Sequence, residues 1–211
     1  MEHRWNERTL PVVSPKHNRK MAGWIRDILA GEFSFLRQLD QNDRSQLIAF
    51  ARKHGIGPAL YLALKEPLRE ICRDDLIELK RIYREDAQNN ILLFHELGKV
   101  LKALGDAGIP VIVLKGACLA EAVYGNIALR SMIDADLLVK KCDLNKAAEV
   151  LKQCGYSANY DFQVDKEIAL QLQHLPTLKA AKKPLIEIHW TIFDYTYFKA
   201  RDEDEAEVGK I

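Results

Sequence analysis

Two carboxylates, Asp134 and Asp136, interrupt the apolar stretch ALRSMIDADLLV at residues 128–139. The residues around them alternate with a period of two, which is typical of a β-strand. This alternation gives two faces, one with Ile133, Ala135, Leu137 and Val139, and one with Met132, Asp134, Asp136 and Leu138. Apolar side chains therefore flank both acids on their own face, and we expect the acids to be partly buried in a strand.

The closeness of these two acids calls for a compensating group. Alternate strand residues point the same way about 6.6 Å apart, and two charges at that distance repel by about 2.5 kcal/mol at an effective dielectric near 20. Either one acid is protonated or a cation lies between them. Mg²⁺, which takes oxygen ligands, is such a cation. Without a metal, we expect Asp136→Asn to relieve repulsion, whereas a structural pair with Arg130 or another cation would make the same substitution destabilising.

A third carboxylate, Glu187, interrupts another strand-like stretch, LIEIHWT at residues 185–191. Alternation places Glu187 and His189 on one face, opposite a face of apolar side chains. Asp-x-Asp alone is also common on surface strands and turns, but three acids on neighbouring strands suit a two-metal site for in-line attack on a phosphate. His189 remains open to two interpretations, a hydrogen-bonded core histidine or a nucleotide contact.

The periodicity of the chain changes near Ile109, and this change predicts an α+β fold. Polar residues and prolines predict a loose arm over residues 1–20, and helical periodicity follows over residues 21–105. Strand-like and helical stretches then alternate, which predicts a small mixed α/β domain over residues 106–200. An acidic tail occupies residues 201–211.

The helical region should end in one long helix that Gly105 and Gly108 terminate. Its apolar stripe recurs every three or four residues, at Leu76, Leu79, Tyr83, Ala87, Ile91, Phe94, Leu97, Leu101 and Leu104. In the second half, we expect a strand over 110–114 that is buried on both faces, and helices that begin near Lys115 and Asp143. Strand-like stretches at 168–178 and 185–193 should form a hairpin.

Composition limits the choice of partners and of compartment. The net charge is +1, which gives no electrostatic reason to expect nucleic acid or an anionic membrane as the partner. The longest apolar run, Ile109–Leu114, is too short to cross a bilayer, and MEHRWNERTLPVV lacks the apolar core of a secretory signal. The four cysteines form no C-x-x-C pair, so we expect free thiols in a reducing cytoplasm.

Both the sequence motifs and the order of the predicted elements resemble a known family. The stretch LKGACLAEAVYGNIALRSMIDADLLV at 114–139 is similar to the pattern LKG-x-A-L…LY…R-x-M-x-D-x-D-L-L-V of the uncharacterised nucleotidyltransferase family. HGIGPALYLAL, AGIPVIVLKG and LIEIHW resemble that family too, so the likeness covers about Leu47 to Phe193. It implies the nucleotidyltransferase fold for the small mixed-sheet domain, and the change of periodicity near Ile109 predicts an N-terminal helical region packed on that domain.

The resemblance also implies roles for the acids. Asp134 and Asp136 would be catalytic ligands of Mg²⁺ or Mn²⁺. Glu187 would be the third catalytic carboxylate and metal ligand, on the side of the acceptor.

Other positions correspond to the nucleotide-binding turn. Lys115 and Gly116 lie where the wider superfamily has a glycine-serine turn that cradles phosphates. Ala117 replaces that serine, so Arg130 or Lys115 would supply the missing phosphate contact, although a solvated lysine and a structurally paired arginine are the plainer alternatives. His189 would contact the nucleotide.

The resemblance implies an enzyme that transfers a nucleoside monophosphate from an NTP to an acceptor and releases pyrophosphate. The acceptor is open between a protein, a peptide, a small molecule and RNA. A non-catalytic nucleotide- or protein-binding module is the alternative, motivated by the missing serine and by a chain that ends 24 residues after Glu187. The intact set of three acids favours the enzyme. A metal phosphohydrolase is less favoured, because the chain offers no further Asp/His cluster.

Overall fold

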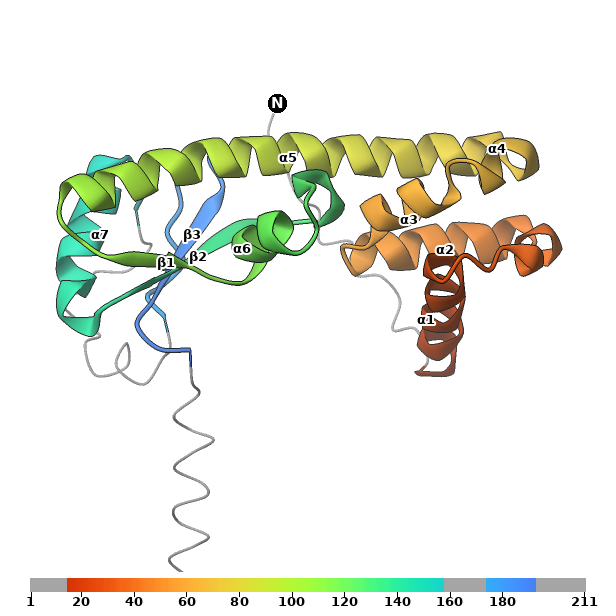
Figure 1. Ribbon diagram of the computed structural model, residues 1–211, viewed down its shortest axis with the longest axis horizontal. Helices are drawn as coiled ribbons and strands as arrows, with labels where there is room; N and C mark the ends of the chain where they lie inside the picture. The colour runs from red at the N-terminus through yellow and green to blue at the C-terminus, as the bar shows by residue number, and fades with distance from the viewer. Residues whose placement is uncertain (1–14, 158–173, 193–211) are drawn as a thin grey trace, which may run out of the picture. The chain divides into compact units, whose positions relative to one another are not determined.

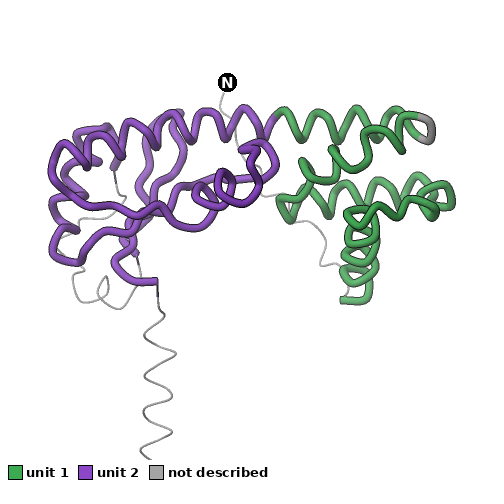
Figure 2. The backbone as a smooth tube through the Cα atoms, viewed as in Figure 1, with its two compact units in different colours: residues 1–84 green, residues 85–211 purple. Residues whose placement is uncertain are grey.

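The computed structural model describes residues 15–157 and 174–192 (Figure 1). It divides into two compact units, residues 1–84 and 85–211 (Figure 2). The boundary falls within helix α5, Arg73–Asp106, which contributes to both units. Residues 1–14 of the expected arm, 168–173 of the expected hairpin and the acidic tail lie outside the described residues.

The described part of the first unit is helical. It contains α1 (Pro15–Leu29), η1 (Ser34–Gln38), α2 (Gln41–Lys53), α3 (Gly57–Leu64), α4 (Pro67–Ile71) and the beginning of α5. Residues 15–20 were expected in a loose arm, and this was wrong, because α1 already begins at Pro15. Proline suits the first turn of a helix, where its missing N–H has no intrahelical partner to lose. Met21, Ile25 and Ile28 then anchor α1 in the core of this unit.

Helix α5 is 34 residues long, and its buried face differs from the predicted stripe. Ile91 was expected inside but is 60% exposed, whereas Asn90 beside it is fully buried. The buried positions from residue 90 onward are Asn90, Leu93, Glu96, Leu97, Val100 and Leu104, which follow one another at helical spacing, and Leu79 and Ile82 are buried nearer the beginning of the helix. Apolar side chains occupy more than one side of this helix, so its neighbours decide which side is covered.

The end of α5 also differs slightly from the prediction. The helix continues through Gly105 to Asp106, and Gly108, at φ +69°, then takes the left-handed conformation that glycine adopts at low cost. Of the helices in the described ranges, none is long and apolar enough to cross a membrane.

The second unit contains a mixed three-stranded sheet, which confirms the α+β prediction. Its strands are β1 (Val111–Val113), β2 (Asp134–Val139) and β3 (Leu185–His189), in the order β1-β2-β3 (Figure 1). β1 pairs antiparallel with β2, and β3 pairs parallel with it. β1 was expected to be buried on both faces, which was wrong, since Ile112 is 61% exposed. As a three-residue edge strand, β1 has only one face covered.

Isolated antiparallel bridges stand where the first strand of a hairpin was expected. The N–H of Leu178 donates to the carbonyl of Ile186 at 2.8 Å, and the N–H of Leu175 donates to that of Ile188 at 2.8 Å. The chain therefore returns alongside β3, as the hairpin prediction required. Residues 174–178 form bridges rather than a continuous strand.

Helices α6 (Lys115–Ala122) and α7 (Leu144–Gln153) complete the unit, together with the short turns η2 (Ile127–Leu129) and η3 (Lys141–Asp143). The inward face of α7 packs in the same core as the apolar faces of β2 and β3 and the C-terminal half of α5. Ala135 and Leu137 of β2 and Ile186 and Ile188 of β3 all lie in this core. The residues that alternate with them are thereby directed to the opposite face of the sheet.

Candidate metal and nucleotide site

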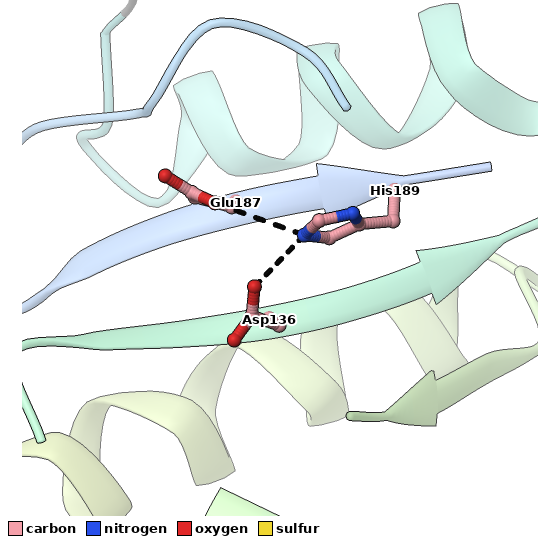
Figure 3. Close-up of side chains that lie close together, drawn as sticks. All are labelled: Asp136, Glu187 and His189. Atoms are coloured by element: carbon pink, nitrogen blue, oxygen red, sulfur yellow. Dashed lines mark hydrogen bonds and ion pairs between the residues drawn. The ribbon is translucent and has the colours of Figure 1, made fainter. Parts of the chain in front are cut away.

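The parallel register of β2 and β3 brings two of the predicted acids together. Asp136 and Glu187 are directly paired positions, although they are far apart in the sequence. Asp136 is only 4% exposed, and Glu187 is partly buried. His189, two residues after Glu187 on the same face of β3, points its Nε2 toward both carboxylates (Figure 3).

Asp136 is paired with two other groups rather than repelled. Its Oδ1 lies 2.6 Å from the Nζ of Lys115 and 2.8 Å from the Nε2 of His189. The Lys115 ammonium is a cation of the kind that the two adjacent acids were expected to require. The structure thus has the alternative arrangement, in which a cation holds Asp136 and Asp136→Asn removes a support, because Asp136 accepts a hydrogen bond from a charged donor.

The pKa of Lys115 is raised, first by its hydrogen bond to Asp136 and then by the charges of Asp136, Glu187 and Asp134, against the opposing effect of burial. Lys115 is the first residue of α6, and its φ of +44° is in the left-handed region that residues other than glycine rarely adopt. A backbone conformation of this kind persists where the surroundings hold it, and it is frequent at functional sites.

Asp134 lies two residues before Asp136 on β2 and is half-buried. The pKa of Asp134 is raised, mainly by burial and then by the negative charges of Asp136 and Glu187, while Lys115 lowers it. The predicted repulsion between the acids therefore acts on Asp134. Its carboxylate does not belong to the close group of potential ligand atoms, which consists of Asp136, Glu187 and His189.

Glu187 has a partner that sequence reasoning missed. The hydroxyl of Thr177 donates to Glu187 Oε1 at 2.8 Å, which leaves Oε2 on the side of His189 at 3.7 Å. The ring of His174 lies 5.1 Å from that of His189. No motif in the sequence marks Thr177, because its role depends on the bridges that bring residues 174–178 alongside β3.

The predicted phosphate turn lies at the start of α6. A Cβ atom on Gly116 would lie 3.2 Å from the Cγ and Sδ of Met132 and 3.4 Å from the Nε of Arg130, so a glycine here lets both side chains approach the helix closely. The Nε of Arg130 is buried and has no hydrogen-bond partner in the described part of the chain. Ala117 is 2% exposed and packs in the core.

Asn90 fixes the segment that carries Arg130, and sequence reasoning missed this residue too. Its Nδ2 donates to the carbonyl oxygens of Ile127 and of Arg130, the latter at 2.6 Å. The side chain is fully buried in the face of α5 that packs in the core. A polar residue among apolar helix positions was the available signal, but the stripe that the spacing predicts passes through Ile91 and leaves Asn90 outside it.

The residues present fit a divalent cation. Asp136, Glu187 and His189 each offer a ligand atom, and these atoms lie within 4.8 Å of one another. Carboxylate oxygens suit Mg²⁺ and Mn²⁺. Asp136 already accepts a cationic group, Lys115, so the position favours positive charge.

A mixed sheet with acids on two neighbouring strands, beside the first turn of a helix, defines an α+β protein with a carboxylate-lined candidate site. The chain belongs to the uncharacterised nucleotidyltransferase family, whose model matches residues 40–208, most of its length. This match confirms the resemblance seen in the sequence. Comparisons with curated proteins and with solved structures give no match.

Proposed function

We propose that the chain is a nucleotidyltransferase, dependent on Mg²⁺ or Mn²⁺, that moves a nucleoside monophosphate from an NTP to an acceptor and releases pyrophosphate. The observation that carries the proposal is the pairing of Asp136 with Glu187 across β2 and β3, with Asp134 on the same strand as Asp136. Membership of the family supports the same reaction class. Four cysteines that are free thiols support a cytoplasmic location.

In this reaction the acceptor nucleophile bonds to the α-phosphorus of the NTP, and the bond from that phosphorus to the bridging oxygen of the pyrophosphate breaks. Asp134, Asp136 and Glu187 would hold the divalent ions, which supply charge neutralisation on the triphosphate and a lower pKa for the acceptor group. Glu187, on the acceptor side, would take up the acceptor's proton. Its hydrogen bond from Thr177 orients the carboxylate for this role.

The start of α6 would bind the triphosphate. The first N–H groups of a helix have no intrahelical partners, and the N-cap residue Leu114 provides no side-chain hydrogen bond to them. Lys115 is 58% exposed in its side chain and can reach phosphate oxygens when it leaves Asp136. The Arg130 guanidinium, which lies against Gly116, would be the second cation of this turn.

The binding-module alternative draws support from Ala117. Its methyl group lies in the core where the superfamily serine would offer a hydroxyl to a phosphate. A module of this kind would bind NTP without transferring it. The two functions therefore differ in turnover rather than in nucleotide binding.

An assay with labelled nucleotides tests the proposal. The full chain is incubated with each NTP labelled at the α-phosphate, with Mg²⁺ or Mn²⁺, and with protein, RNA and small-molecule fractions of a cell extract. We expect one fraction to gain label and pyrophosphate to be released, whereas NTP labelled at the γ-phosphate transfers nothing. Asp136→Asn and Glu187→Gln should abolish labelling.

Asp106→Asn is the matched control, because Asp106 lies at the exposed end of α5 and its ion pair within the described residues is with a surface lysine. This variant should label like the parent. NTP binding without labelling in any fraction would favour the binding module, and labelling that survives both site variants would refute the assigned carboxylates.

A further inference from the structure

His189 places an imidazole nitrogen beside the carboxylates of Asp136 and Glu187, and a metal site built only of carboxylates does not explain this nitrogen. Its side chain is 5% exposed, and its Nε2 lies 2.8 Å from Asp136 Oδ1 and 3.7 Å from Glu187 Oε2. Figure 3 shows the imidazole nitrogen directed at both acids from the same strand as Glu187. All three side chains thus present a potential ligand atom to one small volume.

These separations suit direct coordination of one ion. Bonds of about 2.1 Å place two ligand atoms about 3.0 Å apart at a right angle and about 3.4 Å apart at a tetrahedral angle. The observed 2.8 Å and 3.7 Å lie on either side of these values. Small side-chain rotations are therefore enough to admit an ion between the nitrogen and the two oxygens.

The chemistry of the donors selects the class of metal. Imidazole suits Zn²⁺ and the other first-row transition metals, whereas Mg²⁺ prefers oxygen ligands and keeps several waters. Two carboxylates and one imidazole form a mixed set that Mn²⁺ or Zn²⁺ can use without help from a phosphate. The Lys115 ammonium, 2.6 Å from Asp136 Oδ1, is an independent sign that this oxygen faces a cation.

We propose that Asp136, Glu187 and His189 form a binding site for one first-row transition-metal dication. The ion binds there in the absence of nucleotide and displaces the Lys115 ammonium from Asp136. The role of that metal rests on the proposed function. The inference adds His189 as a ligand, and it names the class of metal that the site binds. Mg²⁺ then binds this donor set weakly until a triphosphate supplies further oxygens.

Electron paramagnetic resonance with Mn²⁺ tests the site in the nucleotide-free full chain. The signal of free Mn²⁺ should fall until one equivalent is bound, Zn²⁺ should displace the ion, and equimolar Mg²⁺ should not. His189→Gln should weaken binding at least tenfold. His174→Gln, which alters the neighbouring ring outside the donor set, should keep the affinity within threefold of the parent.

Two further measurements keep the test independent of how well His189→Gln folds. Pulsed resonance on Mn²⁺ bound to the parent should show coupling to an imidazole nitrogen. Lys115→Met should tighten Mn²⁺ binding, because it removes the competing ammonium. Bound Mn²⁺ without nitrogen coupling, or a folded His189→Gln variant with parental affinity, overturns the proposal.

The outcomes also separate this inference from the proposed function. If Mn²⁺ binds without His189 while nucleotide labelling depends on the three acids, the metal assignment to His189 fails and the transferase stands. If Mn²⁺ binding depends on His189 but no extract fraction is labelled, the metal site stands and the transferase fails.

Discussion

Asp134→Asn and Asp136→Asn should both abolish nucleotidyl transfer, yet change stability in opposite directions. Asp136 is buried and accepts hydrogen bonds from Lys115 and His189, so it supports the fold. Asp134 is half-buried beside two other acids, and its raised pKa means that its ionised form is disfavoured in the folded state. Asp134→Asn therefore removes the free-energy cost of an ionised carboxylate beside two other acids, whereas Asp136→Asn removes the attraction between Asp136 and its two hydrogen-bond donors.

The size of the loss at Asp136 follows from its two partners. Hydrogen bonds to a charged group contribute about 1.5–3 kcal/mol each. The Lys115 contact adds little of this, since that side chain is 58% exposed and solvent screens the pair. Asparagine keeps one acceptor oxygen, so we expect a net loss of about 1.5–3 kcal/mol, or a Tm lower by about 3–12 °C for a chain of this length.

The direction of the stability change caused by Asp134→Asn can also be tested through its dependence on pH. The folded pKa of Asp134 lies above the unfolded value of 3.8, so ionisation opposes folding at neutral pH and the cost disappears as the acid is protonated. Metal-free thermal melts should give Asp134→Asn a Tm at or above that of the parent at pH 7. This advantage should be lost below pH 3.8.

Differential scanning calorimetry of both variants, together with the labelling assay, provides the measurement. Equal destabilisation by the two substitutions would refute the pairing of Lys115 and His189 with Asp136 rather than with Asp134. Retained labelling in either variant would show that the acid is not required for transfer.

Two further predictions concern buried groups beside the sheet. Glu96 is buried between Lys99 at 2.7 Å and Lys183 at 3.0 Å, and these contacts lower its pKa below 4.5. Glu96→Gln should therefore lower the free energy of unfolding, measured in urea, by about 1–3 kcal/mol at pH 7. This loss should become smaller as the pH falls below 4.5, because Glu96 is then protonated in the parent as well. Burial and the Glu96 charge raise the pKa of Tyr156 to about 12, and its hydroxyl has no partner within the described ranges. Tyr156→Phe should therefore melt at or above the parent at pH 7, and should remove the loss of stability that the parent shows as pH rises from 10 toward 12.

The acids of the site were predictable from local pattern, but their geometry was not. Alternation placed Asp134 and Asp136 on one face of a strand and Glu187 on another strand, and both strands exist. The pairing of Asp136 with Glu187, rather than of Asp134 with Glu187, depends on strand register, which the intervening chain sets. A shift by two residues would satisfy the same sequence pattern and give a different site.

Contacts that cross between distant elements were the least predictable. Asn90 holds the segment around Arg130 although it lies 40 residues earlier in the chain, and Thr177 reaches Glu187 through bridges that no motif marks. The exposure of Ile112 has a similar cause, because an edge strand and a central strand have the same apolar sequence pattern. In each case, what the residue contacts depends on an element elsewhere in the chain.

Lys115 connects the structure of the site with the proposed chemistry. Its left-handed backbone costs about 1–2 kcal/mol for a residue other than glycine, and its side chain donates a hydrogen bond to Asp136. If Asp136 held the proposed dication, the Lys115 ammonium would no longer be needed to compensate the charge of Asp136 and would be free to move. The ammonium then stands at the first turn of α6, where a triphosphate would need a cation. Metal binding would therefore prepare the phosphate site, so NTP affinity should rise with metal occupancy in the parent and rise less in Lys115→Ala.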